Sequence, residues 1–286
     1  MKVMMIGAHP DDVEFRSAGL ARKLLKAGNQ VRFLVLCNGS KGHHILSPEK
    51  TRQVRAAEAA NVCRTLGLTG YDIWSDVEDC TLEATLANRQ RLIREIRAFA
   101  PDLVFAHRTN DYHADHRAAG LLVQDASYML IVPHECPEAP AMRSMPVILY
   151  FEDRFTSPTP FRPDVVVDID REIDDKIIAM AQSPSQLFEW LPYSYGEQIP
   201  VPESEEARIA FLRRAIRPDL SDEEVLRAPK IQYALRSAKT AARFRRELIG
   251  QYGEETGSRV RFAEAFALSE YGRQPPREEL LSMLCV

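Results

Sequence analysis

The sequence predicts an α/β protein with a mostly parallel sheet, because short apolar runs alternate with amphipathic segments along its first half. Residues 3–8 and 30–37 are two such apolar runs, and the helical pattern of residues 15–27 separates them. A strand–helix–strand order of this kind forms a right-handed parallel unit. With 286 residues, of which 45% are hydrophobic, the chain can bury a sizeable core. We therefore expect residues 1–286 to form one domain.

The later segments continue this alternation. Ser47 and Pro48 are typical of a helix start, and that helix is expected to end at Gly67. We predict further helices at 86–99, 117–130, 171–182, 183–190 and 231–249, strands at 71–74, 103–106, 146–151 and 164–169, and an edge strand at 260–268. Residues 192–229 contain five prolines and two acidic runs. We interpret them as an insertion or lid that elaborates the C-terminal part.

Composition limits the class of protein. The formal net charge of −4 argues against a protein dedicated to nucleic acid, and no apolar run approaches the roughly 18 residues that cross a bilayer. The N-terminus lacks the pattern of a signal peptide, and five scattered cysteines without a CxxC pair are typical of reduced thiols. We therefore expect a cytoplasmic protein with a small-molecule partner, no nucleic acid and no membrane. The basic segment 231–249 is interpreted as a solvated face or a subunit contact, so a homo-oligomer stays open.

A cluster of ionisable residues follows the first strand. His9, Asp11, Asp12 and Glu14 stand within six positions, at the carboxyl end of a strand, where open α/β sheets bind ligands. Asp11 and Asp12 repel each other unless a cation or hydrogen bonds compensate them. Histidine with carboxylate suits zinc and, less selectively, iron or cobalt. Taken alone, this cluster is more simply explained as a solvated acidic turn.

A second cluster of ionisable residues, at positions 107–116 after the 103–106 strand, changes that interpretation. Both clusters lie on one rim of the sheet, so His9, Asp12 and one or both of His113 and His116 can converge. Three protein ligands leave a zinc ion an open position for water, which is the catalytic arrangement. A nearby carboxylate can take the water's proton, and a histidine can stabilise the oxyanion. His107 is expected to pack at the rim. The two clusters together predict a metal-assisted hydrolase.

Together the motifs AHPDDVE and HADH resemble the PIG-L/LmbE family of zinc-dependent N-deacetylases. The resemblance spans most of the chain outside 192–229. It implies a Rossmann-like αβα sandwich and the removal of an acetyl group from N-acetylglucosamine-type substrates. It also implies one zinc ion per chain, although other divalent transition metals stay open.

The resemblance also assigns roles to individual positions. The implied zinc ligands are His9, Asp12 and His116. The implied catalytic residues are Asp11 as general base, His113 as oxyanion stabiliser, and Asp115 as the carboxylate that orients His113 and keeps it cationic. Arg55 resembles a substrate-binding arginine and Asp79 an acidic sugar contact, although spacing alone makes Arg55 and Glu58 a surface ion pair.

Two positions depart from the family pattern. Arg16 stands where the family commonly has a glycine-rich helix start, so it either narrows the substrate site or points to solvent. Ala114 replaces a common proline in the second motif, and neither change removes a ligand.

We expect a hydrolase that removes an acyl group, above all acetyl, from the amide nitrogen of an amino sugar or its conjugate. One alternative is a metallohydrolase of a non-sugar amide or an ester. The other is a non-catalytic protein that binds metal or sugar on the same fold.

Overall fold

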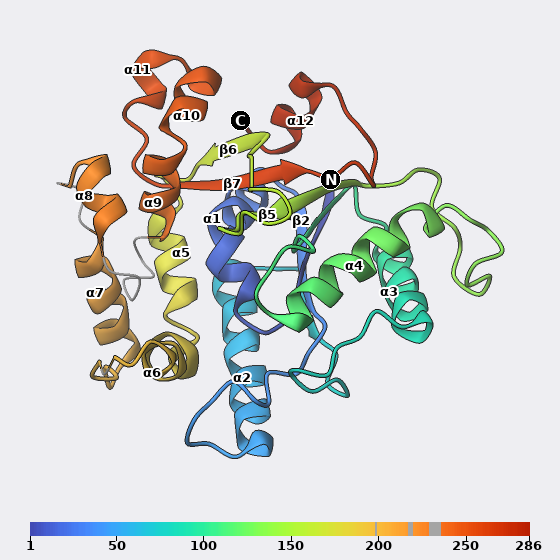
Figure 1. The fold of residues 1–286 in the computed structure, drawn as a ribbon, viewed down its shortest axis with the longest axis horizontal. Helices are drawn as coiled ribbons and strands as arrows, with labels where there is room; N and C mark the ends of the chain where they lie inside the picture. The colour runs from blue at the N-terminus through green and yellow to red at the C-terminus, as the bar shows by residue number, and fades with distance from the viewer. Residues whose placement is uncertain (198, 217–219, 229–235) are drawn as a thin grey trace.

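The computed structural model describes residues 1–197, 199–216, 220–228 and 236–286, and its centre is a seven-stranded sheet (Figure 1). The strands are β1 (Lys2–Gly7), β2 (Gln30–Val35), β3 (Gly70–Ile73), β4 (Leu103–Ala106), β5 (Val147–Phe151), β6 (Val165–Asp168) and β7 (Ala263–Leu268). Their order across the sheet is β3-β2-β1-β4-β5-β7-β6. The first five in that order run parallel, and β7 is antiparallel to both of its neighbours. The sheet is therefore mixed but mostly parallel, as predicted.

Strand β1 lies at the centre of the parallel part. Val3 pairs with Val31 of β2 on one side and with Leu103 of β4 on the other. Successive side chains of a strand point to opposite faces, so Val3 and Met5 enter one core cluster while Met4 and Ile6 enter another. The uninterrupted apolar run of β1 is thus explained by burial on both faces.

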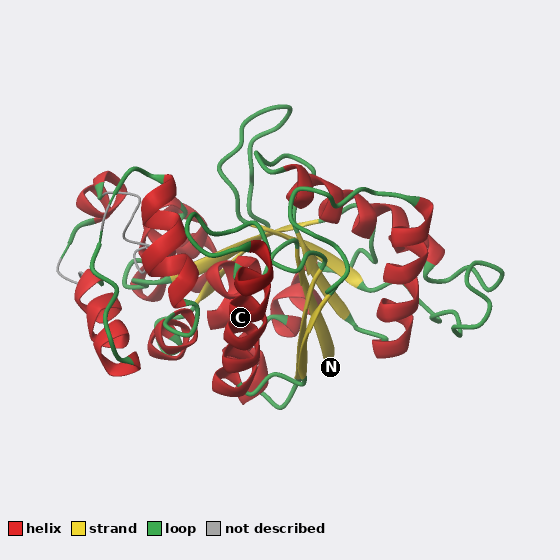
Figure 2. Cartoon of the chain, turned by 90° about the horizontal axis from the view of Figure 1, so that it is seen from below, coloured by secondary structure: helices red, strands yellow, loops and turns green. Residues whose placement is uncertain are grey.

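Helices cover both faces of the sheet, which Figure 2 shows from below. On one face are α1 (Asp12–Lys26), α2 (Pro48–Leu66) and α5 (Ile173–Met180), and on the other are α3 (Leu86–Phe99) and α4 (Ala114–Met129). Leu20 and Val62 join the core beneath the first group, whereas Ile93 and Leu122 join the core beneath the second. The predicted αβα sandwich is confirmed.

The C-terminal part adds short helices at one side of the sandwich (Figure 1). They are a π-helical turn η1 (Ser185–Trp190), α6 (Leu191–Ser194), α7 (Glu205–Ala215), α8 (Asp222–Arg227), α9 (Arg236–Arg243), α10 (Arg245–Tyr252) and α11 (Glu254–Gly257). A last helix, α12 (Arg277–Met283), lies apart from them near the C-terminus (Figure 1). Helix α7 buries Leu212 against a cluster that includes Met180 of α5 and Phe188 of η1. The predicted insertion at 192–229 therefore packs on the α5 side, apart from its residues 198, 217–219 and 229, which lie outside the described residues.

Two predicted elements differ from the structure. Segment 260–268 was expected as an edge strand, but β7 pairs with β5 on one side and β6 on the other. The expected helix at 231–249 ends at Arg243, and a second helix starts after Phe244, whose φ of −112° and ψ of 32° interrupt the first. Phe244 is buried in a separate apolar cluster beside β6 and β7, and residues 231–235 lie outside the described residues.

In the part of the chain that the structure describes, no helix is both long enough and apolar enough to cross a membrane.

Candidate metal centre and active site

The two predicted clusters meet at the carboxyl ends of β1 and β4, which are neighbours in the sheet. His9 lies two residues after the end of β1, and Asp12 is the first residue of α1. Ala114 begins α4 after the loop that leaves β4, so His116 stands in its first turn. The Nδ1 atom of His9 lies 3.3 Å from Nε2 of His116, across 107 positions of sequence. The predicted convergence of the two motifs is therefore present.

His9, Asp12 and His116 form a triangle of possible ligand atoms. Asp12 Oδ2 lies 3.5 Å from His9 Nδ1 and 3.3 Å from His116 Nε2. A tetrahedral zinc ion with bonds of about 2.0–2.2 Å places its ligands about 3.3–3.6 Å apart. The observed distances match that edge length, and the donor set of two imidazoles and one carboxylate suits zinc. These three residues therefore fit the expected ion.

Carboxylates fix the orientation of both histidines. His9 Nε2 lies 2.9 Å from Asp115 Oδ2, and His116 Nδ1 lies 2.9 Å from Asp111 Oδ1. Each carboxylate accepts a hydrogen bond from one ring nitrogen, which leaves the lone pair of the other nitrogen for a metal. Burial raises the pKa of Asp115, but the hydrogen bonds from His9 and from the Cys80 N–H, together with the charges of His9 and His113, outweigh it and bring the pKa to about 2. Both histidines thus have the support that metal-binding histidines require.

Asp12 is fixed from its other side by Arg16. Nη1 of Arg16 donates to Asp12 Oδ1 at 2.8 Å, while Asp12 Oδ2 accepts the backbone N–H groups of Ala8 and His9 at 3.1 and 2.8 Å. Burial opposes ionisation, but the neighbouring His116, His107 and Arg16 lower the pKa of Asp12 well below its usual range. Arg16, which the sequence left between two interpretations, is therefore a residue that orients the carboxylate.

Asp11 has an unusual backbone conformation directly beside the ligands. Its φ of 113° is rare for a residue other than glycine, and such a conformation costs about 1–3 kcal/mol. The Tyr71 hydroxyl accepts the Asp11 N–H at 3.2 Å and donates to Glu14 at 3.0 Å. Burial raises the pKa of Asp11 to about 6, against the opposing charge of Arg55. A carboxylate held this way is suited to accept a proton.

Arg55 lies in a different environment from the one the sequence suggested. Its side chain is 2% exposed and contacts Asp11 at 3.0 Å and Glu58 at 3.1 Å. Glu58 in turn accepts two hydrogen bonds of 2.8 Å from the backbone N–H and hydroxyl of Ser185. The Arg55–Glu58 pair is therefore buried, not on the surface. Arg55 positions Asp11, and its burial does not fit the expected substrate contact.

Asp79 is likewise engaged within the protein. Its two carboxylate oxygens accept the N–H groups of Gly39 and Lys41 at 2.8 and 3.0 Å, and the residue is 5% exposed. It anchors the rim loop that follows β2. Gly39 has a φ of +78°, and a Cβ there would lie 2.9 Å from Cγ of Arg55, so the loop packs tightly over that side chain. The expected sugar contact at Asp79 does not fit this arrangement.

His113 lies beside the candidate metal ligands, at the start of α4. Its ring centroid lies 4.7 Å from that of His9 and 5.1 Å from that of His116. The Nδ1 atom accepts the Asp115 N–H at 3.2 Å, which places the ring proton on Nε2. Burial and the two neighbouring histidines lower the pKa of His113, so its imidazole is neutral at neutral pH.

The structure changes the expected partner of Asp115. Its Oδ2 atom lies 3.8 Å from His113 Nδ1 but 2.9 Å from His9 Nε2. The same carboxylate also accepts the backbone N–H groups of Cys80 and Leu82, at 2.6 and 3.2 Å. The side chain of Asp115 therefore orients His9, whereas the hydrogen bond to His113 comes from the Asp115 backbone N–H. The expected cationic His113 does not follow from this geometry.

Sequence reasoning missed several supporting residues. Asp111 could have been found, because it stands five positions before His116 in the same motif. Glu14 was noticed only as part of the acidic cluster, yet it is fully buried, and burial raises its pKa to about 8. Tyr71 carries no sequence signal, because its bond to Asp11 spans 60 positions.

His107 takes the packing role that was expected. It is 2% exposed, accepts the Ala8 N–H at 3.2 Å, and stacks on His116 with ring centroids 4.3 Å apart. Burial lowers the pKa of His107 to about 3, so the ring stays neutral. The His107 ring therefore packs against the ring of the candidate ligand His116.

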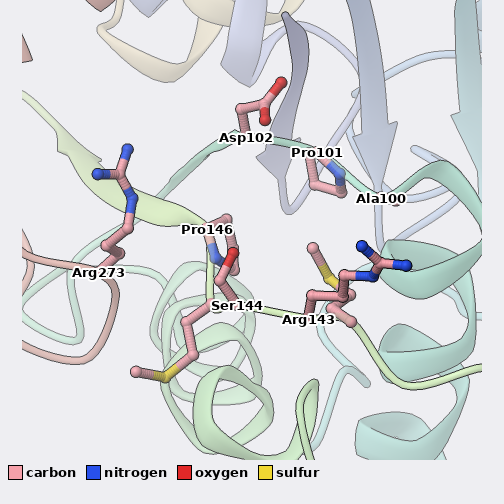
Figure 3. A pocket seen from close by; sticks show the side chains of 9 residues that line it. Ala100, Pro101, Asp102, Arg143, Ser144, Pro146 and Arg273 are labelled. Atoms are coloured by element: carbon pink, nitrogen blue, oxygen red, sulfur yellow. The ribbon is translucent and has the colours of Figure 1, made fainter.

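A cavity of about 340 Å³ adjoins the candidate centre, and Arg16, Asp111 and Tyr112 form part of its wall. Another cavity, of about 220 Å³, lies at the opposite rim, where Asp102 and Pro146 precede β4 and β5 (Figure 3). Ligands of open α/β sheets bind at the carboxyl ends of the strands, so the first cavity is the candidate substrate site.

Comparisons with known proteins relate the chain to deacetylases. Residues 4–127 match the family model described as PIG-L: GlcNAc-PI de-N-acetylase. Over 212 residues, the chain is 26% identical to a diacetylchitobiose deacetylase from Thermococcus kodakarensis, covering 67% of this chain and 74% of the relative.

Two solved structures share the fold. N,N'-diacetylchitobiose deacetylase from Pyrococcus horikoshii has a TM-score of 0.65 at 21% identity, covering 94% of this chain and 84% of its own. GalB, a 4-carboxy-2-hydroxymuconate hydratase from Pseudomonas putida, has a TM-score of 0.69 at 17% identity, covering 96% and 98%. The second match shows that this fold also serves a reaction other than deacetylation. The residues that match the family model, 4–127, include both the β1 cluster and the β4 cluster.

Proposed function

We propose that this chain is a metal-dependent hydrolase that removes an acetyl group from the amide nitrogen of an amino sugar or its conjugate. The observation that carries the proposal is the triangle of His9, Asp12 and His116 ligand atoms, at 3.3–3.5 Å, with Asp11 and His113 beside it. The family match and the diacetylchitobiose deacetylase relative support the acetylated amino sugar as substrate.

His9 Nδ1, Asp12 Oδ2 and His116 Nε2 would hold the ion, with Asp115, Asp111 and Arg16 fixing the three ligands. When bound, zinc would polarise the acyl carbonyl and lower the pKa of a water molecule to about 7.

The protein's own residues supply the proton transfers. Asp11, held by Arg55 at 3.0 Å, accepts a proton from the attacking water. His113 carries its proton on Nε2, because Nδ1 accepts the Asp115 N–H, and it donates a hydrogen bond to the oxygen that develops negative charge. Collapse of the tetrahedral intermediate then breaks the carbon–nitrogen bond, and the amine leaves with the proton that Asp11 took from the water.

Two alternative functions remain to be compared with this proposal. Hydrolysis of a non-sugar amide or an ester would use the same residues, and only the substrate separates it from deacetylation. A protein that only binds metal or sugar would not need a buried carboxylate in a strained backbone beside the ligands. The hydratase resemblance, at 17% identity, concerns the fold alone.

The test measures the metal content of the protein and its release of free amine in the same preparation. The protein is purified without added metal, and its bound ions are measured. Release of free amine from diacetylchitobiose and from simple acyl amides is then followed before chelation, after chelation and after zinc return. About one zinc per chain and chelator-sensitive release from the sugar support the proposal. Bound zinc with release only from the simple amides or from an ester would replace it with the first rival.

Two variants separate the expected roles. Asp11→Asn should keep zinc and lose turnover by about 10²–10⁴-fold, the usual contribution of a general base. His116→Ala should lose both zinc and turnover. Equal zinc loss in the two variants would contradict the division between ligand and base.

A further inference from the structure

The cavity of about 340 Å³ beside the candidate metal centre contains an aromatic surface. Tyr112 and Phe155 both line this cavity. Their ring centroids lie 6.2 Å apart, with 32° between the ring planes. We infer that these two rings are the surface on which the sugar ring of the substrate lies while its acetamido group reaches the metal ligands. The inference deepens the proposed function and rests on it for the identity of the substrate as an amino sugar.

Tyr112 connects this aromatic surface to the metal site. Its ring centroid lies 5.6 Å from that of His116 and 5.7 Å from that of His113, and the rings of both pairs are close to perpendicular. Edge-to-face contacts of this kind are favourable between aromatic rings. A molecule that lies on the Tyr112 ring is therefore separated by one side chain from a candidate ligand and from the proposed oxyanion donor.

The packing of the core does not explain the position of these rings. Tyr112 is 72% exposed, and Phe155 is half-buried. Small-ligand sites are concave and are lined by aromatic side chains together with a few polar groups, and apolar surface that stays exposed in one place marks such sites. The two rings meet this description, because both border the same cavity at the edge of the metal site.

Two arginines fix the backbone that carries the two rings. Nη1 of Arg117 donates to the carbonyl of Tyr112 at 3.0 Å. Arg108 donates to the carbonyl of Phe155 at 3.3 Å and to Asp153 at 2.6 and 2.8 Å. The N–H group of Phe155 donates in turn to Asp153 at 3.0 Å. The backbone of both residues is therefore ordered before substrate binds, which lowers the entropic cost of binding.

The chemistry of the cavity suits a pyranose ring. The C–H groups of such a ring form an apolar face, and its hydroxyl groups project around the edge. The face of an aromatic side chain carries partial negative charge and attracts C–H groups. Apart from a third aromatic residue, Tyr195, the other side chains that line the cavity are charged. Carboxylates and guanidinium groups that already have one partner can form further hydrogen bonds, which hydroxyl groups would use and an alkyl chain would not.

Binding is measured without turnover, so that the result does not depend on deacetylation. The zinc-loaded Asp11→Asn variant is titrated by calorimetry with N-acetylglucosamine and with its octyl glycoside. In this background, we expect Tyr112→Ala and Phe155→Ala each to weaken the binding of N-acetylglucosamine about three- to tenfold, because each removes one aromatic contact. Tyr112→Phe should bind the sugar as tightly as the parent, because the ring remains.

Two controls separate contact with the sugar from a structural role of the rings. Tyr128→Ala removes another exposed tyrosine, 61% exposed in the last turn of α4, and should leave sugar binding unchanged. The zinc affinity of every variant should equal that of the parent, because neither ring is a candidate ligand. A ring that only supported His113 or His116 would lower the zinc affinity when it was removed.

Unchanged sugar affinity in either alanine variant would overturn the inference. So would a loss in Tyr112→Phe as large as that in Tyr112→Ala, because the hydroxyl group would then make the contact. A loss confined to the octyl glycoside would place the aglycone on the rings, and a zinc-loaded protein that binds neither compound would have no such sugar site; both results overturn the inference. Sugar binding that depends on both rings, in a protein whose wild type releases no amine, would support the aromatic surface and overturn the proposed deacetylation.

Discussion

The partner of Asp115 provides the sharpest test of the site. The family resemblance makes it the residue that orients His113, whereas the structure places its carboxylate 2.9 Å from His9 and 3.8 Å from His113. We expect Asp115→Asn to weaken zinc binding, because the amide can no longer accept the His9 proton as a charged group. Loss of such a carboxylate support costs about 10–100-fold in metal affinity, or about 1.4–2.7 kcal/mol.

Asp111→Asn should have an effect of the same size, because it removes the corresponding bond of 2.9 Å to His116. Asp76→Asn is the control, because Asp76 pairs with Arg91 at an exposed position. Zinc affinity is measured by competition with a chromogenic chelator, and turnover by amine release at saturating zinc.

The two roles for Asp115 predict different patterns. A support for His9 lowers zinc affinity, and excess zinc restores much of the turnover. A support for His113 leaves zinc affinity at the wild-type value and lowers kcat at every zinc concentration. The second pattern would refute the reasoning from the distances.

Three further predictions concern the surroundings of the site. Arg55→Met should destabilise the protein by about 3–5 kcal/mol in denaturant unfolding, because it leaves Asp11 and Glu58 buried without their shared cation; a change below about 1 kcal/mol would contradict this. Gly120→Ala should lower the free energy of unfolding by about 1–3 kcal/mol, because the new Cβ would lie 2.7 Å from the His107 carbonyl. Gly250→Ala is the control and should not destabilise the protein, because the space around Gly250 is open. A maleimide should react first at Cys80, because this cysteine is exposed. The modification should stop amine release, because the Cys80 N–H is bonded to Asp115. Inhibition that persists in the Cys80→Ser variant would place the reactive thiol elsewhere.

Local patterns were sufficient for the parallel half of the fold. Strands β1, β2 and β4 are short and mostly apolar, and β3 is a short edge strand of the sheet. Helices separate these strands in the sequence, and strands that follow one another in the sequence are neighbours in the sheet or nearly so. Strand β7 is different, because it comes from the C-terminal end and inserts between β5 and β6. Its Glu264 is buried through a bond of 2.6 Å to Lys176, and that partner lies 88 positions away. Nothing in the local pattern of segment 260–268 reveals that compensation.

In the site, too, features set by neighbouring residues in the sequence were predictable, whereas contacts between distant residues were not. The convergence of His9 and Asp12 with one or both of His113 and His116 was predictable, because their spacing and place after strands are local features, whereas the choice of His116 as the third ligand came from the family resemblance and stays a prediction. The supports of Asp11 were not, because Tyr71 and Arg55 come from β3 and α2 and meet Asp11 only in the folded chain. Arg55 and Glu58 were correctly seen as a pair, but the burial that turns the pair into a support depends on Ser185 of η1.

Reaction type depends on these side chains more than on the fold. The chain superposes with TM-scores of 0.65 and 0.69 on a deacetylase and a hydratase, so the sandwich by itself does not select a reaction. Hydrolysis of an amide needs a base for water and a donor for the oxyanion, and we propose Asp11 and His113, which lie beside the three candidate ligands, for these two roles. The contacts that hold them, from Arg55 to Asp11 and from the Asp115 backbone to His113, come from elements that the fold would form without them. Substitutions at these contacts should therefore change the chemistry while the strand order and the helices remain as they are.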